Sequence, residues 1–284
     1  MKRSRPSDIK QLLTELDCLP SRVLGQNFLV DENILHIILE SAHLAEDDVV
    51  LEIGPGLGVL TEHLAKRAKR VIAIEKDPKL AAYLREAFAS QPAFHLIEDD
   101  ALNQPLRDLL RDKGITHVIS NLPYSAGTRI LMELVDAEHR PLRMVVMLQV
   151  DVAERLAALH GSKAYGLASI HAQMFYDVVL RKVVSPTCFY PPPDVKSAIV
   201  ELYRRAHPQT PLRNTTHFNG LLKWCFSQRR KQLGRILLNA PDTIVSPGSD
   251  VKHVLEESGV RPDQRPESIP VATWGALSNA LSDT

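Results

Sequence analysis

Runs dominated by apolar residues alternate with helix-patterned segments along the first half of the chain. Five runs read as strands, at 49–53, 71–75, 94–97, 118–119 and 143–148. Strands that are covered on both faces of a parallel sheet are continuously apolar in this way. Between them, 57–66 and 78–88 have the apolar spacing of helices. The alternation predicts an α/β fold with a Rossmann-like, doubly wound sheet.

Two more strands are predicted at 178–184 and 197–203, and prolines separate them. Pro208 and Pro211 then mark a linker, and helical patterns follow at 218–228, 231–238, 251–257 and 271–281. We therefore expect an α/β catalytic domain over residues 1–206. A small all-helical domain is expected over residues 207–284.

Polar groups stand where three of the predicted strands end, and they suggest a cofactor site. Gly54, Gly56 and Gly58 follow the first strand and let the backbone approach a ligand closely. Their GxGxG spacing differs from the GxGxxG of nicotinamide sites and suits a cofactor without a pyrophosphate. Glu75 can accept hydrogen bonds from ribose hydroxyls, and Asp100 from an adenine amine. The alternative is a tight turn followed by solvated strand ends.

The tetrapeptide Asn121-Leu122-Pro123-Tyr124 follows the fourth strand and suggests an acceptor site for a planar amine. The Asn121 side-chain oxygen and the Leu122 carbonyl can accept hydrogen bonds from an exocyclic amine, because a residue before proline is held extended. Tyr124 offers a stacking face. In the alternative interpretation, this segment only ends a strand.

A second aromatic group is predicted in the proline-rich segment Phe189–Ser197. The prolines would stiffen a loop that presents Phe189 or Tyr190 to a flipped-out base. The alternative for Phe189, read alone, is a place in the core. No cysteine lies between Cys18 and Cys188, which argues against cytosine-C5 chemistry because that reaction needs a cysteine nucleophile.

Composition narrows the class of protein further. The three cysteines are scattered without a CxxC motif, which indicates a reducing cytoplasm and predicts neither disulfides nor a metal site. No apolar stretch approaches the roughly 18 residues of a membrane span. The basic N-terminus leads into an amphipathic segment, whereas a signal peptide would continue with an apolar one. The formal net charge is zero, yet residues 204–239 hold eight Lys and Arg and no acidic residue. This segment predicts a basic face for phosphates.

Together these motifs resemble those of the ribosomal RNA adenine dimethyltransferases, almost from end to end. The matching segments are Leu24–Leu29, Glu52–Gly58, Glu75, Asp100, Asn121–Tyr124, Phe189–Ser197 and Phe226–Lys231. The resemblance implies S-adenosylmethionine as cofactor and dimethylation of two adjacent adenines near the 3′ end of small-subunit rRNA, coupled to small-subunit biogenesis. The expected partner is that rRNA or the immature small subunit, bound by a monomer without a metal or a membrane.

The resemblance also implies roles for individual residues. Those expected to bind the cofactor are Asn27, Leu29, Gly54, Gly56, Glu75, Lys76, Asp100, Ala101 and Asn121. Those expected at the reaction itself are Asn121, Leu122, Pro123, Tyr124 and Phe189, the last stacking on the target base. Those expected to bind rRNA are Lys223, Arg229, Arg230, Lys231 and Arg235.

Two positions depart from the family pattern. Ser125–Arg129 lacks the usual proline and contains Gly127, which predicts a looser helix start, with Arg129 placed to reach an RNA phosphate. Lys76 stands where an apolar residue commonly covers the cofactor adenine, although its aliphatic stem could do the same.

Three other functions stay open at this point. The macrolide-resistance methyltransferases, which act on large-subunit rRNA, tend to have Asn-Ile-Pro-Tyr where this chain has Leu122. A non-catalytic ribosome-assembly factor would not need Glu75, Asp100 and Asn121 together. A nicotinamide oxidoreductase would differ in the cofactor that it binds.

Overall fold

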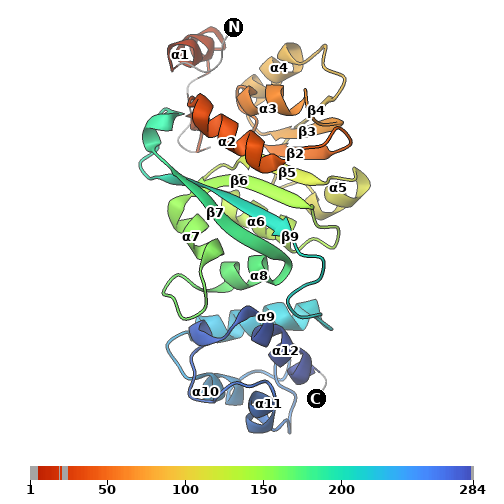
Figure 1. Ribbon diagram of the computed structural model, residues 1–284, viewed down its shortest axis with the longest axis vertical. Coiled ribbons are helices and arrows are strands. Elements are labelled where there is room, and N and C mark those ends of the chain that lie inside the picture. Colours follow the sequence, from red (N-terminus) through yellow and green to blue (C-terminus); the bar gives the residue numbers. More distant parts are fainter. Residues whose placement is uncertain (1–5, 19, 21–24, 283–284) are drawn as a thin grey trace. The chain divides into compact units, whose positions relative to one another are not determined.

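The main sheet has seven strands in the part of the chain that the structure describes (Figure 1). A computed structural model gives residues 6–18, 20 and 25–282; Leu24, which begins the first matching segment, lies outside them. All seven predicted strands are present, in the order β4-β3-β2-β5-β6-β9-β7. Their bounds are β2 Val49–Ile53, β3 Arg70–Glu75, β4 Phe94–Glu98, β5 His117–Asn121, β6 Arg143–Gln149, β7 Tyr176–Val184 and β9 Ser197–Arg204.

The order of the strands reverses between β2 and β5. From β2 the chain moves outward through β3 to β4, then returns to place β5 and β6 on the other side of β2, all in parallel. Strand β9 joins β6 in antiparallel register. The connecting helices are α3 Val59–Leu64, α4 Pro78–Ala87, α5 Leu106–Asp112 and α6 Gly127–Val135. A ligand site is expected beyond the carboxyl ends of the strands at this reversal.

Helix α2 (Glu32–Ala42) shows how local sequence builds one layer. It begins at Asp31, whose side chain accepts from the backbone N–H groups of Asn33 and Ile34. Its apolar side packs with α3 against the sheet residues Ile119 and Val145, and these side chains form one buried cluster. This layer holds one face of the central strands in place.

A short second sheet joins two distant segments. Strand β1 (Phe28–Leu29) pairs antiparallel with β8 (Phe189–Tyr190), just after the 3-10 turn η1 (Pro186–Cys188). The register places Phe28 opposite Tyr190 and Leu29 opposite Phe189. Helix α1 (Pro6–Glu15) packs its apolar side on a cluster that includes Phe28. The matching segments Leu24–Leu29 and Phe189–Ser197 are therefore neighbours where Phe28 and Leu29 pair with Phe189 and Tyr190.

By contacts, the chain divides into two compact units. Unit 1 comprises residues 1–153 and 179–204, and unit 2 comprises residues 154–178 and 205–284. The helices of unit 2 are α8 Leu167–Phe175, α9 Thr215–Ser227, α10 Leu233–Leu238, α11 Val251–Glu257 and α12 Val271–Ser282, with η2 at Pro266–Ser268; α7 (Val150–Ala157) spans the division. The predicted boundary at 206/207 separates a catalytic domain from an rRNA-binding domain, and this division by function stays a prediction.

Unit 2 has an apolar core of its own. Fully buried side chains from α8, α9, α10 and α12 form one cluster around Phe218 and Trp274. Tyr165 closes it, because its buried hydroxyl donates to the Ile269 carbonyl at 2.8 Å. No helix among the described residues is long and apolar enough to cross a membrane.

Candidate active site

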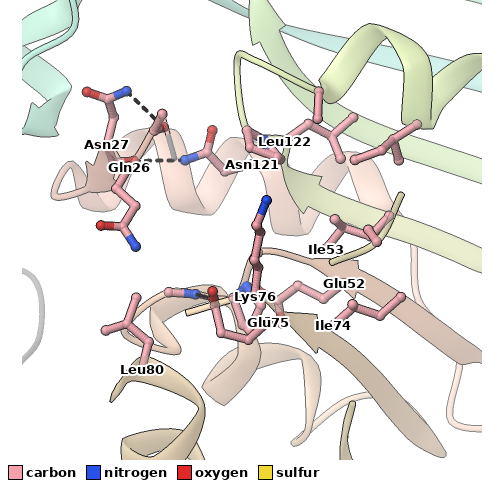
Figure 2. Close-up of a pocket in the computed structure, with 18 of the residues that line it drawn as sticks. Gln26, Asn27, Glu52, Ile53, Ile74, Glu75, Lys76, Leu80, Asn121 and Leu122 are labelled. Carbon is pink, nitrogen blue, oxygen red and sulfur yellow. Dashed lines mark hydrogen bonds between the residues drawn. The ribbon is translucent and has the colours of Figure 1, made fainter. Parts of the chain in front are cut away.

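A cavity of about 320 Å³ opens at the carboxyl ends of the strands, where their order reverses (Figure 2). Its lining comes from the segment 25–29, the glycine loop after β2, the ends of β3 and β4, and the segment that follows β5. The volume is at the lower end of the roughly 300–1,000 Å³ of small-molecule sites. All predicted cofactor residues, namely Asn27, Leu29, Gly54, Gly56, Glu75, Lys76, Asp100, Ala101 and Asn121, line it.

Two glycines of the loop are required for different reasons. Both have left-handed backbones, with φ +69° at Gly54 and +74° at Gly58. A Cβ on Gly58 would lie 2.6 Å from Phe88 Cε2, so this glycine permits close packing of α3 against α4. A Cβ on Gly54 would meet only Pro123 Cδ at 4.0 Å and would otherwise project into open space. Gly54 therefore leaves room that a ligand can fill.

Glu75 ends β3 as a buried carboxylate that is already anchored. The Gly56 N–H donates to its Oε2 at 3.0 Å, and the Asp77 N–H donates to its Oε1 at 2.9 Å. Burial raises the pKa of Glu75, and these backbone hydrogen bonds act in the opposite direction. Each carboxylate oxygen can accept a second hydrogen bond, so Glu75 can bind a pair of ribose hydroxyls in a fixed position.

Asp100 follows β4 and holds two hydrogen bonds. Its Oδ1 accepts from the Leu102 N–H at 2.9 Å, and its Oδ2 accepts from Lys76 Nζ at 2.7 Å. The Lys76 hydrogen bond, followed by that of Leu102, holds the pKa of Asp100 below its usual range. The carboxylate is therefore ionised and beside the cavity, with Ala101 buried next to it.

Asn121 ends β5 and lines the cavity. Its Nδ2 donates to the Asn27 carbonyl at 3.1 Å (Figure 2), and this bond decides which way the amide group faces. The other end of the amide, Oδ1, is buried and has no hydrogen-bond partner among the described residues. A buried acceptor without a partner costs free energy. A ligand that donates a hydrogen bond to Asn121 Oδ1 would remove this cost.

Tyr124 lines the same cavity and is held by a contact from β9. Its hydroxyl is hydrogen-bonded to Ser197 Oγ, and Ser197 is fully buried. Burial raises the pKa of Tyr124, so the phenol is neutral and offers an aromatic face. Leu122 and Pro123, between Asn121 and Tyr124, also line the cavity.

Phe189 is the predicted site residue that the structure does not bring to this cavity. Its side chain is 3% exposed and packs in the core cluster with Leu29 and Ile199. Its neighbour Tyr190 is half-buried and packs with Phe28. Stacking on a base would require Phe189 to leave its cluster, and this role stays a prediction.

Glu52 is a cavity residue whose own role the sequence reasoning missed. It lies in β2, is 2% exposed, and accepts from the Thr61 hydroxyl at 2.7 Å. Burial raises the pKa of Glu52 to about 8, so it is mostly protonated at neutral pH and puts little charge into the cavity. The available signal was an acidic residue inside an otherwise apolar buried strand.

The predicted RNA-binding residues all lie in unit 2, but they differ in setting. Lys223, Arg230, Lys231 and Arg235 are exposed. Arg229 is instead tied down: it forms an ion pair with Glu267 at 3.3 Å and donates to the Lys163 carbonyl at 2.8 Å. Arg229 therefore links Glu267 to the backbone at Lys163 within unit 2.

The cavity fits an S-adenosylmethionine-type cofactor. There is open space beside Gly54, because a Cβ added there would meet almost nothing. Glu75 is a fixed carboxylate and Asp100 an ionised one. These groups suit the ribose and the base of a nucleoside that lacks a pyrophosphate. The neutral acceptor of Asn121 lies at the same cavity and suits an amine. Fold and site together define the class as the Rossmann-like, S-adenosylmethionine-dependent methyltransferases.

Comparison with known proteins identifies the family. The ribosomal RNA adenine dimethylase family model matches residues 21–280. The chain is 40% identical over 275 residues to the ribosomal RNA small subunit methyltransferase A of Opitutus terrae, covering 96% of this chain and 97% of the relative. The protein of the same name from Clostridium perfringens is 36% identical over 272 residues, with 96% and 94% covered.

Two solved structures of similar fold are a dimethyladenosine transferase and an rRNA methyltransferase. A dimethyladenosine transferase from Plasmodium falciparum has a TM-score of 0.76 at 25% identity, covering 88% of this chain and 95% of the other. The 23S rRNA methyltransferase ErmE has a TM-score of 0.67 at 26% identity, with 90% and 100% covered. The chain belongs to the ribosomal RNA adenine dimethylase family. It is a methyltransferase that dimethylates adenine in rRNA with S-adenosylmethionine, as the sequence predicted.

Proposed function

We propose that this chain dimethylates N6 of two adjacent adenines near the 3′ end of small-subunit rRNA. The observation that carries the proposed site is Asn121 Oδ1, a buried acceptor on a cavity-lining residue that has no hydrogen-bond partner among the described residues. An adenine amine brings two N–H donors. One of them satisfies Asn121, and the Leu122 carbonyl, held extended before Pro123, accepts the other.

These two acceptors act on the amine by orientation. Adenine N6 is a weak nucleophile because its lone pair is delocalised into the ring. Acceptors on both N–H groups favour a pyramidal nitrogen whose lone pair faces the methyl group that S-adenosylmethionine supplies when bound. Tyr124 fixes the base plane by stacking. No general base is required, because the nitrogen releases its proton to solvent only after it carries the new methyl group. Positioning supplies most of the catalysis.

The cofactor roles follow the cavity lining. Glu75 accepts from the ribose hydroxyls, Asp100 accepts from the adenine amine, and Gly54 leaves room for the backbone to approach. Lys76 and Ala101 would flank the adenine, and Asn27 and Leu29 line the same cavity. Asn27 also holds the Asn121 amide through its carbonyl.

The small subunit is proposed as the source of the rRNA because of the relatives. Those named for the small subunit match over 94–97% of their own length, C-terminal part included. ErmE, which is named for 23S rRNA, also matches along its whole length, and it supports the second candidate. We further infer a cytoplasmic monomer without a metal. It would act on immature small subunits, with the exposed cations of unit 2 on rRNA phosphates.

The test offers the protein and labelled S-adenosylmethionine to undermethylated small subunits and, in parallel, to large subunits. Mass spectrometry of the digested rRNA then locates N6,N6-dimethyladenosine. We expect it only in small-subunit rRNA, at two adjacent positions. Label only in large-subunit rRNA would replace the proposal with the resistance-type activity. Absence of label despite cofactor binding and RNA binding would favour a non-catalytic assembly factor.

A further inference from the structure

Lys76 forms the one ion pair that the structure places at the cavity among the described residues. Its ammonium lies 2.7 Å from Asp100 Oδ2, and the two side chains are 55% and 23% exposed. Figure 2 shows the Lys76 side chain rising from the end of β3 across the cavity, with its ammonium toward the side that carries Asn121. A charged group therefore occupies the place where the adenine of a cofactor would reach Asp100.

The two oxygens of Asp100 are not equivalent. Oδ1 is bound by the backbone N–H of Leu102 and so is part of the loop structure. Oδ2 is bound only by a side chain, which can move. An incoming adenine amine would donate to Oδ2, where an ammonium already lies. The amine hydrogens and the ammonium are both positive, so they do not share that oxygen without repulsion, and hydrogen bonds to an ammonium are the stronger kind.

We propose that Lys76 is an affinity-determining residue that competes with the cofactor adenine for Asp100. The inference rests on the proposed role of Asp100. Cofactor binding would exchange the lysine ion pair for a hydrogen bond from an uncharged amine to the carboxylate, and the free Lys76 stem would then lie along the adenine. Because the pair is partly exposed, salt screens it. The competition is therefore strongest at low ionic strength and fades as salt rises.

The experiment measures S-adenosylmethionine binding by calorimetry, at low and high salt, for the wild type and four variants, of which Asp100→Ala removes the carboxylate itself. Lys76→Met keeps the apolar stem and removes the charge. Lys76→Arg keeps an ion pair. Lys66→Met is the matched control, because Lys66 pairs with Glu62 at 2.8 Å and is 58% exposed but does not line the cavity.

We expect Lys76→Met to bind roughly two- to fivefold more tightly than the wild type at low salt, as for a partly exposed ion pair. The two affinities should converge at high salt. Lys76→Arg should bind no more tightly than the wild type, and Lys66→Met should match it.

Equal or weaker binding by Lys76→Met at low salt would overturn the proposal. A gain that persists unchanged at high salt would also overturn it, because better apolar packing would then be the cause. If Asp100→Ala instead binds S-adenosylmethionine as tightly as the wild type, the proposed role of Asp100 is refuted, and the proposed competition is refuted with it.

Discussion

Asn121 shows how much of the site depends on one oriented amide. Its nitrogen donates to the Asn27 carbonyl, so its oxygen is the end left to accept a hydrogen bond. Glu52 and Glu75 lie at the same cavity with raised pKa values. Burial thus reduces the negative charge of Glu52. The acceptor proposed for the adenine amine is then the neutral amide of Asn121 and not a carboxylate base.

Asn121→Ala is expected to lower kcat for rRNA methylation by roughly 100-fold or more, the effect of removing one preorganised hydrogen-bonding group. RNA affinity should change little, because phosphate contacts dominate it. Single-turnover methylation and a filter-binding assay measure the two quantities. Normal turnover by a folded variant would contradict the proposed role.

The hydrogen bond between the Tyr124 and Ser197 hydroxyls predicts that Ser197 is a positioning residue for the acceptor site. Tyr124→Phe and Ser197→Ala should each lower kcat/KM several-fold by freeing the ring. The double variant should be no worse than the more affected single variant, because both changes remove the same contact.

The control for that cycle is Ser41→Ala. Ser41 is also buried, but its hydroxyl has no hydrogen-bond partner within the described part of the chain, so kcat/KM should hold. Strictly additive losses for Tyr124→Phe and Ser197→Ala would mean that the hydrogen bond does not orient the ring.

At the scale of elements, the segment after β5 departs from the family pattern yet is well packed. Helix α6 begins at Gly127 without a side-chain cap. The Pro123 carbonyl compensates by accepting from the Gly127 N–H at 2.7 Å. A Cβ on Gly127 would lie 3.1 Å from the side chains of Leu122 and Leu148. The added glycine thus lets α6 approach the strand ends, and Arg129 stays exposed.

The glycine loop gives a paired prediction. Gly58→Ala should lower the free energy of unfolding by roughly 2 kcal/mol or more, because left-handed strain adds to overpacking against Phe88. Gly54→Ala should lose only about 1 kcal/mol, since its new methyl enters open space.

Cofactor affinity should follow the opposite order. Gly54→Ala should weaken S-adenosylmethionine binding at least tenfold while remaining folded, and Gly58→Ala should weaken it less at a temperature where it is folded. Urea unfolding and calorimetry give the two rankings. Identical rankings in both measurements would show that Gly54 does not border the cofactor.

At the scale of the whole molecule, charge in sequence and charge in space differ. Residues 204–239 contain no acid, yet Arg205 meets Asp177 at 2.6 Å and Arg229 meets Glu267 at 3.3 Å. The acidic partners come from outside the segment. Two of the eight cations are therefore already paired, whereas Lys223, Arg230, Lys231 and Arg235 are exposed. We predict that these four bind rRNA phosphates.

Arg230→Ala with Lys231→Ala should weaken rRNA binding and reduce the slope of log K against log salt by roughly 1 per cation removed. Arg229→Ala should instead lower Tm, because it releases Glu267 and the Lys163 carbonyl. Lys252→Ala, in an exposed ion pair of unit 2 with Glu256, should change neither slope nor Tm appreciably. An unchanged slope for the double variant would exclude these two cations from the interface.

The sequence alone determined the α/β order, the positions of the strand ends and the polar groups on them. Parallel strands bring all their carboxyl ends to one edge, so Gly54, Glu75, Asp100 and Asn121 had to share a site once the strands were recognised. Helix α2 was not predicted, although the Asp31 cap and the apolar spacing from Ile34 to Ala42 signal it. The short β1–β8 pair was not predicted because two-residue strands carry no periodic pattern.

Only the tertiary structure decided which of these groups are free to bind. Lys76 reaches Asp100 across 24 residues of sequence, Arg229 reaches Glu267 across 38, and Asn27 orients Asn121 across 94. The burial of Phe189 beside Leu29 likewise depends on the pairing of β1 with β8. A side chain's partners are set by where the backbone returns in space, and no periodicity in the sequence encodes that distance.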